Sequence, residues 1–427
     1  MDLVSFLFLS AAIIFVGVLG ELIFARTNIP DVLLLMLLGI VIGPFLLLVD
    51  PSLLWKIAPF FSAIALTVIL FEGGLHLNIY EVIKNMPASF SLSLLSFIII
   101  GLFVSVAYYS LGFFGIIQNV TLINSLILGA TLAGTSSILL IPLMLKSKVN
   151  RKILDILGLE STYNDVFVIV AVVALIKFAI GSSAGTYGID SVLKEVAANF
   201  AVGLVIGALL GLLWLYVLKF FKKKSDELIH HYMLTFACLL IVYVVSEYLG
   251  GSSALAVLMF GLVLGNAHQI GLILRLSDNF TVDTEVRRFN SQVSFFVKTF
   301  FFAFIGMLFV LDFQLVLIGI VITAIIFAAR FVSVKIFSVK YSLSKNDFFA
   351  LSTLIPKGLA AAVVSIMPMQ YGIAGTENFI AYTFSVILAT TIIATISFYI
   401  VQKKAIENKD QQQEAVTEIN VPEIDQI

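Results

Sequence analysis

The sequence predicts an all-helical (all-α) membrane protein with thirteen transmembrane helices, on three observations. Of its 427 residues, 60% are hydrophobic and only 12% are charged, and the mean hydropathy is +1.10. Apolar runs repeat along the chain, and most reach the roughly 20 residues that a helix needs to cross a bilayer. Lysine and arginine gather in alternate loops, as they do on the cytoplasmic side of membrane proteins. A soluble domain of this length is therefore excluded.

The thirteen apolar runs are assigned as helices in chain order. They begin near Leu3, Val32, Ile57, Ile83, Thr121, Lys152, Asp190, Ile229, Ser252, Phe289, Phe313, Asp347 and Glu377. The first run lacks a basic start and continues past Glu21 to Arg26, so it is kept as a mature helix. Residues 1–402 then form one membrane domain. Residues 403–427 are rich in Gln, Glu and Asp, and we expect a short disordered cytoplasmic tail there.

The positions of the basic residues predict the orientation of the chain. With the N-terminus outside, the outer loops hold only Lys56 and Lys194. The inner loops hold Arg26, Lys84, Lys146, Lys148, Arg151, Lys152, Lys219, Lys222, Lys223, Lys224, Arg275, Arg287, Arg288, Lys340, Lys345, Lys403, Lys404 and Lys409. Because cytoplasmic loops retain Lys and Arg, this split predicts a multi-pass protein of the cell membrane with its C-terminus in the cytoplasm.

Two of the predicted helices contain stretches that disfavour a continuous helix. The fifth carries small and hydroxyl residues from Gly129 to Ser137, which favour unwinding because hydroxyls satisfy freed backbone groups. The twelfth contains Pro356, which lacks a backbone donor, and Gly358, which weakens the helix further. The alternative interpretation is that the small residues allow tight helix packing. The two helices are seven apart in the chain order, which puts them at equivalent positions in two inverted six-helix repeats joined by one linking helix. Paired broken helices at equivalent positions predict a transporter with a binding site at the membrane midplane.

Asp165 is the most informative single residue. It precedes the apolar run from Val166 to Ile176, and it lies about 20 Å along the helix axis from Lys152, near the membrane midplane. An acidic side chain at that depth costs several kcal/mol or more and usually marks an ion or proton path. Ser161, four residues before Asp165, shares its face of the helix.

A second charged residue within the membrane, Arg330, needs an anionic partner because arginine does not lose its proton. Glu160 is the obvious candidate, since it shares a helix face with Asn164 and points away from Asp165. We therefore interpret Glu160 and Arg330 as a structural ion pair.

The ordered motifs resemble those of a known family. Residues 160–165, Glu-Ser-Thr-Tyr-Asn-Asp, resemble the Glu-x-x-x-Asn-Asp signature of monovalent cation–proton antiporters of the NhaP branch. Residues 71–75, Phe-Glu-Gly-Gly-Leu, are similar to the third-helix motif of that family. The region around Thr135 and residues 298–306, 329–330 and 356–358 follow in the same order, and the resemblance extends to about Gln402.

The resemblance implies a homodimer with a dimer domain, a moving core domain and crossed, unwound fifth and twelfth helices. It implies exchange of Na+, K+ or Li+ for H+ and a role in pH homeostasis. Asp165 would bind the ion with help from Ser161, Glu72 and the backbone of Thr135. Asn164 would lie at the helix crossing, and an Asn-Asp pair in place of two aspartates implies electroneutral exchange.

The sequence also departs from the family pattern. Residues 135–137 are Thr-Ser-Ser where many members carry Thr-Asp-Pro, so Ser136 stands where a carboxylate is common. Lys357 stands where many members have arginine, and Lys298 replaces another arginine. Lysine is a point charge that can lose its proton when buried, so Lys298 and Lys357 are candidate modulators of the ion site. Ser136 is a third candidate, because it replaces a carboxylate.

The chemistry of exchange needs only one carboxylate, because a proton and a cation compete for the same oxygens. We expect no cofactor and no catalytic residue, membrane lipid as a partner, and no nucleic-acid partner. Three alternatives remain: a proton-coupled organic-ion carrier on the same fold, a passive cation channel, and an intramembrane hydrolase that uses Ser136 or Ser137. Cys238 is the only cysteine, which excludes an intrachain disulfide.

Overall fold

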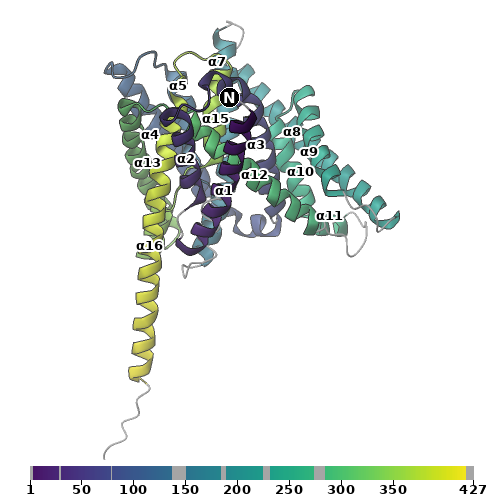
Figure 1. Ribbon diagram of the computed structural model, residues 1–427. Helices are drawn as coiled ribbons and strands as arrows, with labels where there is room; N and C mark the ends of the chain where they lie inside the picture. Colours follow the sequence, from purple (N-terminus) through teal and green to yellow (C-terminus); the bar gives the residue numbers. More distant parts are fainter. Residues whose placement is uncertain are drawn as a thin grey trace, which may run out of the picture.

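The computed structural model describes residues 3–27, 30–77, 79–136, 151–183, 189–224, 231–273 and 284–419, and every regular element among them is a helix (Figure 1). The first half of the chain holds α1 (Leu3–Thr27), α2 (Asp31–Ile40), the π-helix η1 (Val41–Phe45), α3 (Pro51–His76), α4 (Ile79–Phe113), α5 (Leu122–Ala133), α7 (Arg151–Ser183) and α8 (Ile189–Lys224). The second half holds α9 (His231–Tyr248), α10 (Ser253–Gly265), α11 (Ala267–Ile273), α12 (Thr284–Met307), α13 (Phe313–Lys340), α14 (Lys345–Thr353), α15 (Leu359–Gln370) and α16 (Phe379–Ile419).

The expected helix starts agree with the observed ones to within a few residues. The largest difference is in α3, which begins at Pro51 rather than near Ile57. Asp50 caps this helix by accepting a hydrogen bond from the backbone N–H of Ser52 at 2.8 Å, and proline favours the first helical position. Seven of the described helices are long and apolar enough to cross a membrane. The number of crossings and the side on which each terminus lies stay predictions.

The helices fall into two groups that pack mainly within themselves. The first contains α1, α2, α3, α8, α9, α10 and α12, and the second contains α4, α5, α7, α13, α14, α15 and α16. Few contacts join the groups, chiefly α3 against α15 and α7 against α8. Within the first group α2 approaches α12 closely, because Gly39 and Gly306 lie against each other and leave no room for side chains.

The structure shows the break in the predicted twelfth helix and the end of the first half of the predicted fifth helix. Helix α5 ends at Ala133, and Gly134 continues with extended backbone. The second half of the predicted fifth helix, including Ser137, lies outside the described residues. In the predicted twelfth helix, α14 ends at Thr353 and α15 begins at Leu359, so residues 354–358 are not helical.

The last helix, α16, runs into the C-terminal tail. Helix α16 continues without a break to Ile419, and Figure 1 shows it extending well beyond the rest of the molecule. Gln, Glu, Ala and Lys are all good helix formers, and the tail extends a helix that has already passed the costly nucleation step. The expected short disordered cytoplasmic tail, residues 403–427, stays a prediction.

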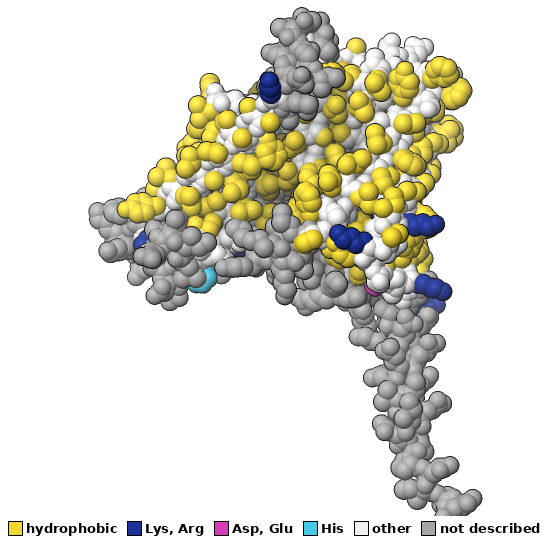
Figure 2. Space-filling model, turned by 180° about the vertical axis from the view of Figure 1, so that it is seen from behind, with side chains coloured by type: hydrophobic (Ala, Val, Ile, Leu, Met, Phe, Trp, Pro, Cys, Tyr) yellow, Lys and Arg dark blue, Asp and Glu magenta, His cyan; other side chains and the backbone are white. Residues whose placement is uncertain are grey.

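The outer surface matches a chain that lies in lipid. Figure 2 shows hydrophobic side chains over most of the described surface on one face, with Lys and Arg toward its edges. The exposed apolar side chains include Phe8, Phe15, Phe60 and Phe313. A monomeric soluble protein rarely exposes so much contiguous apolar surface.

Candidate ion site at a helix crossing

The two non-helical segments meet inside the second group of helices. The backbone N–H of Ser136 donates a hydrogen bond to the carbonyl of Pro356 at 2.9 Å, which joins the break after α5 to the break before α15. Gly358 packs so tightly on the Ser136 side chain that a Cβ atom there would overlap it. The close approach explains why the chain carries glycine at this point.

Lys357 donates hydrogen bonds to the backbone carbonyls at the C-terminal end of α5. Its side chain is fully buried, and Nζ donates to the carbonyl of Gly134 at 2.6 Å, with the carbonyl of Ala133 at 3.5 Å. Its backbone N–H donates to Oγ1 of Thr390 on α16 at 3.1 Å. The last carbonyls of a helix lack intrahelical donors and carry a partial negative charge, so a lysine there is both hydrogen-bonded and electrostatically favoured.

Three of the predicted site residues come together at Thr135. Ser161 on α7 donates from Oγ to the Thr135 carbonyl at 3.0 Å, and Asn164 donates from Nδ2 to Oγ1 of Thr135 at 3.1 Å. The side chains of Ser161 and Asn164 are buried, and Oδ1 of Asn164 has no hydrogen-bond partner among the described residues. The crossing therefore presents the hydroxyl of Ser161 and the unused amide oxygen of Asn164 on α7, next to the carbonyl of Thr135 in the segment after α5.

Asp165 lies beside this cluster at the junction of the two groups of helices. Its carboxylate makes no hydrogen bond or ion pair with any residue that the structure describes, and its side chain is half-buried. It lines a small cavity whose other walls are aliphatic, formed by Leu66, Ile69, Leu70, Leu359, Ala360 and Val363. Because an unpaired charge in apolar surroundings is costly, this carboxylate favours a bound proton or cation.

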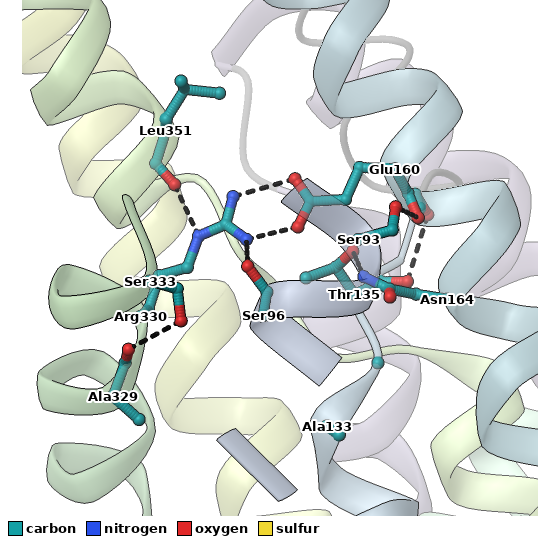
Figure 3. Close-up of polar contacts among 12 residues, drawn as sticks. Ser93, Ser96, Ala133, Thr135, Glu160, Asn164, Ala329, Arg330, Ser333 and Leu351 are labelled. Atoms are coloured by element: carbon teal, nitrogen blue, oxygen red, sulfur yellow. Dashed lines mark hydrogen bonds and ion pairs between the residues drawn. The ribbon is translucent and has the colours of Figure 1, made fainter. Parts of the chain in front are cut away.

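The expected ion pair is present and fully buried (Figure 3). Arg330 on α13 makes a bidentate contact with Glu160, with Nη2 at 2.8 Å from Oε2 and Nη1 donating to Oε1. Its Nε donates to the carbonyl of Leu351 on α14 at 2.7 Å, and Nη1 also donates to Oγ of Ser96 on α4 at 2.8 Å. The guanidinium thus ties four helices of the second group together through α7, α4, α13 and α14.

Two predicted site residues lie elsewhere. Glu72 accepts a hydrogen bond from Oγ of Ser294 on α12 and does not line the Asp165 cavity. Lys298, one turn beyond Ser294, pairs with Asp31 at the start of α2, with Nζ 3.0 Å from Oδ2. The sequence interpretation missed Asp31 and Ser294. The argument that Arg330 needs an acid applies equally to Lys298 and would have prompted a search for Asp31.

Comparisons with known proteins agree with this architecture. The model of the family described as sodium/hydrogen exchanger, transmembrane, matches residues 11–404. The chain is 25% identical over 407 residues to a K+/H+ antiporter NhaP2 from Shewanella sp. strain MR-4, covering 91% of this chain and 65% of that protein. It thus spans less than two thirds of that relative's length. It is also 26% identical over 371 residues to Na+/H+ antiporter 1 of Methanocaldococcus jannaschii, covering 82% and 80%.

The fold itself has a counterpart among solved structures. The sodium proton antiporter MjNhaP1 from Methanocaldococcus jannaschii, solved at pH 8, superposes with a TM-score of 0.75 at 22% identity, covering 94% of this chain and 98% of that one. The family match extends over nearly the whole chain, through both breaks, the buried ion pair and Asp165. The chain belongs to the transmembrane sodium/hydrogen exchanger family of cation–proton antiporters.

Proposed function

We propose that this protein exchanges one monovalent cation for one proton at Asp165, by alternating access across the cell membrane. The observation that carries the proposal is the position of Asp165. It is a carboxylate without a partner among the described residues, in an aliphatic cavity between two groups of helices that share few contacts. Movement of one group against the other would expose the same carboxylate to either side in turn.

The ligands around Asp165 suit a hard monovalent cation. Ser161 lies one turn away on the same helix, and the carbonyl of Thr135 is already within hydrogen-bond distance of Ser161. Together with the carboxylate, these are oxygen ligands of the kind that unwound transporter helices supply. Asn164 is neutral and its Nδ2 is held by Thr135, so Asp165 is the acidic side chain among the oxygen ligands proposed here. One acidic ligand, in place of two, supports electroneutral exchange.

We propose Na+ as the exchanged cation, with K+ and Li+ as further substrates. The named relatives divide on this point, since one is a K+/H+ antiporter and another a Na+/H+ antiporter. The proposed homodimer and cell-membrane location follow the same resemblance. Against the hydrolase alternative, Lys357 donates to backbone carbonyls, so it is not available to activate the hydroxyl of Ser136.

The test is cation-driven proton movement in proteoliposomes, followed with a pH-sensitive dye for Na+, K+ and Li+ under a clamped membrane potential. We expect the wild type to exchange at a rate that does not depend on the potential, and Asp165→Asn to be folded and inactive. Asp312→Asn is the matched control, because Asp312 caps α13 at an exposed position and asparagine caps equally well. Exchange by Asp165→Asn at the wild-type rate would refute the site.

A further inference from the structure

Lys177 is the one basic residue in the membrane-spanning part of α7, Ile156–Gly181. Its side chain is half-buried, and it lies less than two turns from the end of α7 at Ser183. A charged side chain within a membrane helix needs a polar partner, and its position often reflects a function. The contacts of Lys177 therefore bear on how α7, the helix that carries Asp165, moves.

One partner of Lys177 is Asn199 on α8. The Oδ1 atom of Asn199 accepts a hydrogen bond from Nζ of Lys177, and its Nδ2 donates to the carbonyl of Gly250, in the turn between α9 and α10. Only this orientation of the amide gives both of its atoms a partner, because the reverse sets donor against donor and acceptor against acceptor. The amide of Asn199 thus joins α7 to two elements of the first group of helices.

The first group holds Asn199 firmly in place. The backbone N–H of Ser252 donates to the carbonyl of Asn199 at 2.9 Å. Gly203, one turn further along α8, packs on the backbone of Ser252 so closely that a Cβ atom would overlap it. The start of α8 and the turn before α10 therefore form one packed unit. Lys177 belongs to the second group, so its contact with Asn199 crosses the junction between the two groups.

A second polar contact crosses the junction at the opposite end of the molecule. Tyr399 on α16 donates from its hydroxyl to the carbonyl of Thr27, the last residue of α1, at 3.0 Å. The charge distribution assigns the end of α7 to the outside, and the end of α1, next to Arg26, to the cytoplasm. Because a hydrogen bond depends steeply on distance and angle, either contact is lost when the two groups move apart at that end.

We propose that Lys177 and Asn199 form a latch that holds the outer ends of α7 and α8 together while the ion site faces the cytoplasm. The inference rests on the proposed function, because a latch needs two groups of helices that move. Asp165 is on the same helix, about 18 Å from Lys177 along the axis, so opening the latch moves the helix of the ion site away from α8 at its outer end. Lys177 touches neither cation nor proton and is a positioning residue that sets the share of molecules facing each side.

The experiment compares the KM for the cation on the two sides of the membrane. Exchange is measured with Na+ and with K+ in right-side-out and in inside-out membrane vesicles. The ratio of the outer KM to the inner KM reports the share of molecules facing each side, because apparent affinity falls with the fraction open to that side. We expect Lys177→Met to lower this ratio about tenfold, since a hydrogen bond from a charged group shifts an equilibrium by roughly that factor.

Three variants separate a latch from a general loss of structure. Lys177→Arg keeps a donor and should keep the wild-type ratio. Adding Asn199→Leu to Lys177→Met should cause little further change, because the two residues share one contact. Tyr399→Phe removes the contact at the opposite end and should leave the ratio unchanged or raise it. Partial misfolding lowers the maximal rate in both kinds of vesicle and leaves the ratio of KM values unaffected.

The outcomes for the latch and for the proposed function are distinct. A wild-type ratio in Lys177→Met, with exchange intact, would overturn the latch alone. A fall in the ratio of equal size in Tyr399→Phe would also overturn it, because loosening the junction at either end would then have the same effect. Absence of exchange in the wild type would overturn the proposed function and the latch with it.

Discussion

Replacing Glu160 by glutamine tests whether the buried ion pair holds the second group of helices together. The new side chain keeps one oxygen for the guanidinium of Arg330, but its NH2 group would face a nitrogen that now donates to Oε1 or Oε2 of Glu160. The two contacts of Arg330 with Leu351 and Ser96 remain. The change therefore leaves a fully buried positive charge with neutral partners only.

The expected cost follows from these contacts. Removing one partner of a buried ion pair costs about 3–5 kcal/mol, because the other charge stays buried and uncompensated. The two remaining hydrogen bonds from Arg330 place the expected loss at the lower end, about 3 kcal/mol. The assay is thermal unfolding of the purified protein in detergent, with exchange measured in parallel. We expect a Tm several degrees below that of the wild type and reduced exchange.

The double variant Glu160→Met/Arg330→Met provides the control, because it removes both charges and keeps apolar volume. We expect it to melt above Glu160→Gln, since well-packed apolar residues often replace a buried ion pair at little cost. A Glu160→Gln protein that melts with the wild type would refute the reasoning, because the charge on Arg330 would then be balanced by something other than Glu160.

Two further predictions concern the helix crossing. Lys357→Met removes the donor to the Gly134 carbonyl, so we expect a loss of about 1–3 kcal/mol in stability and slower exchange, while Lys357→Arg should retain most exchange. Thermal unfolding and dye-based exchange are measured in parallel on both variants. Wild-type stability and exchange in Lys357→Met would count against the role of this ammonium. Gly358→Ala places a methyl group on the Ser136 side chain and should lose about 1–3 kcal/mol. Ser136→Gly added to Gly358→Ala should recover most of that loss in the same melts, and failure to do so would show that the crossing is strained elsewhere.

The sequence predicted those features of the fold that rest on local chemistry. Apolar runs predicted where helices begin, and Pro356 and Gly358 predicted the interruption between α14 and α15. The partner of Arg330 was predictable because a buried guanidinium needs an acid, and Glu160 was oriented away from Asp165.

Features that depend on how distant helices meet were not predictable in the same way. No spacing along the chain indicates that Ser294 on α12 reaches Glu72 on α3, or that Lys298 reaches Asp31. The resemblance places Glu72 with Asp165, and in the structure its carboxylate accepts a hydrogen bond from Ser294 on α12.

The most direct test of the central claim is the pH dependence of cation affinity in the wild-type protein. If one carboxylate, Asp165, holds either a cation or a proton, the two ligands compete for the same oxygens. The apparent dissociation constant for Na+ or K+ should then rise about tenfold for each pH unit of acidification in the range where Asp165 binds a proton, with no change in the maximal exchange rate. A cation affinity that stays constant over that range, while exchange persists, would contradict the account.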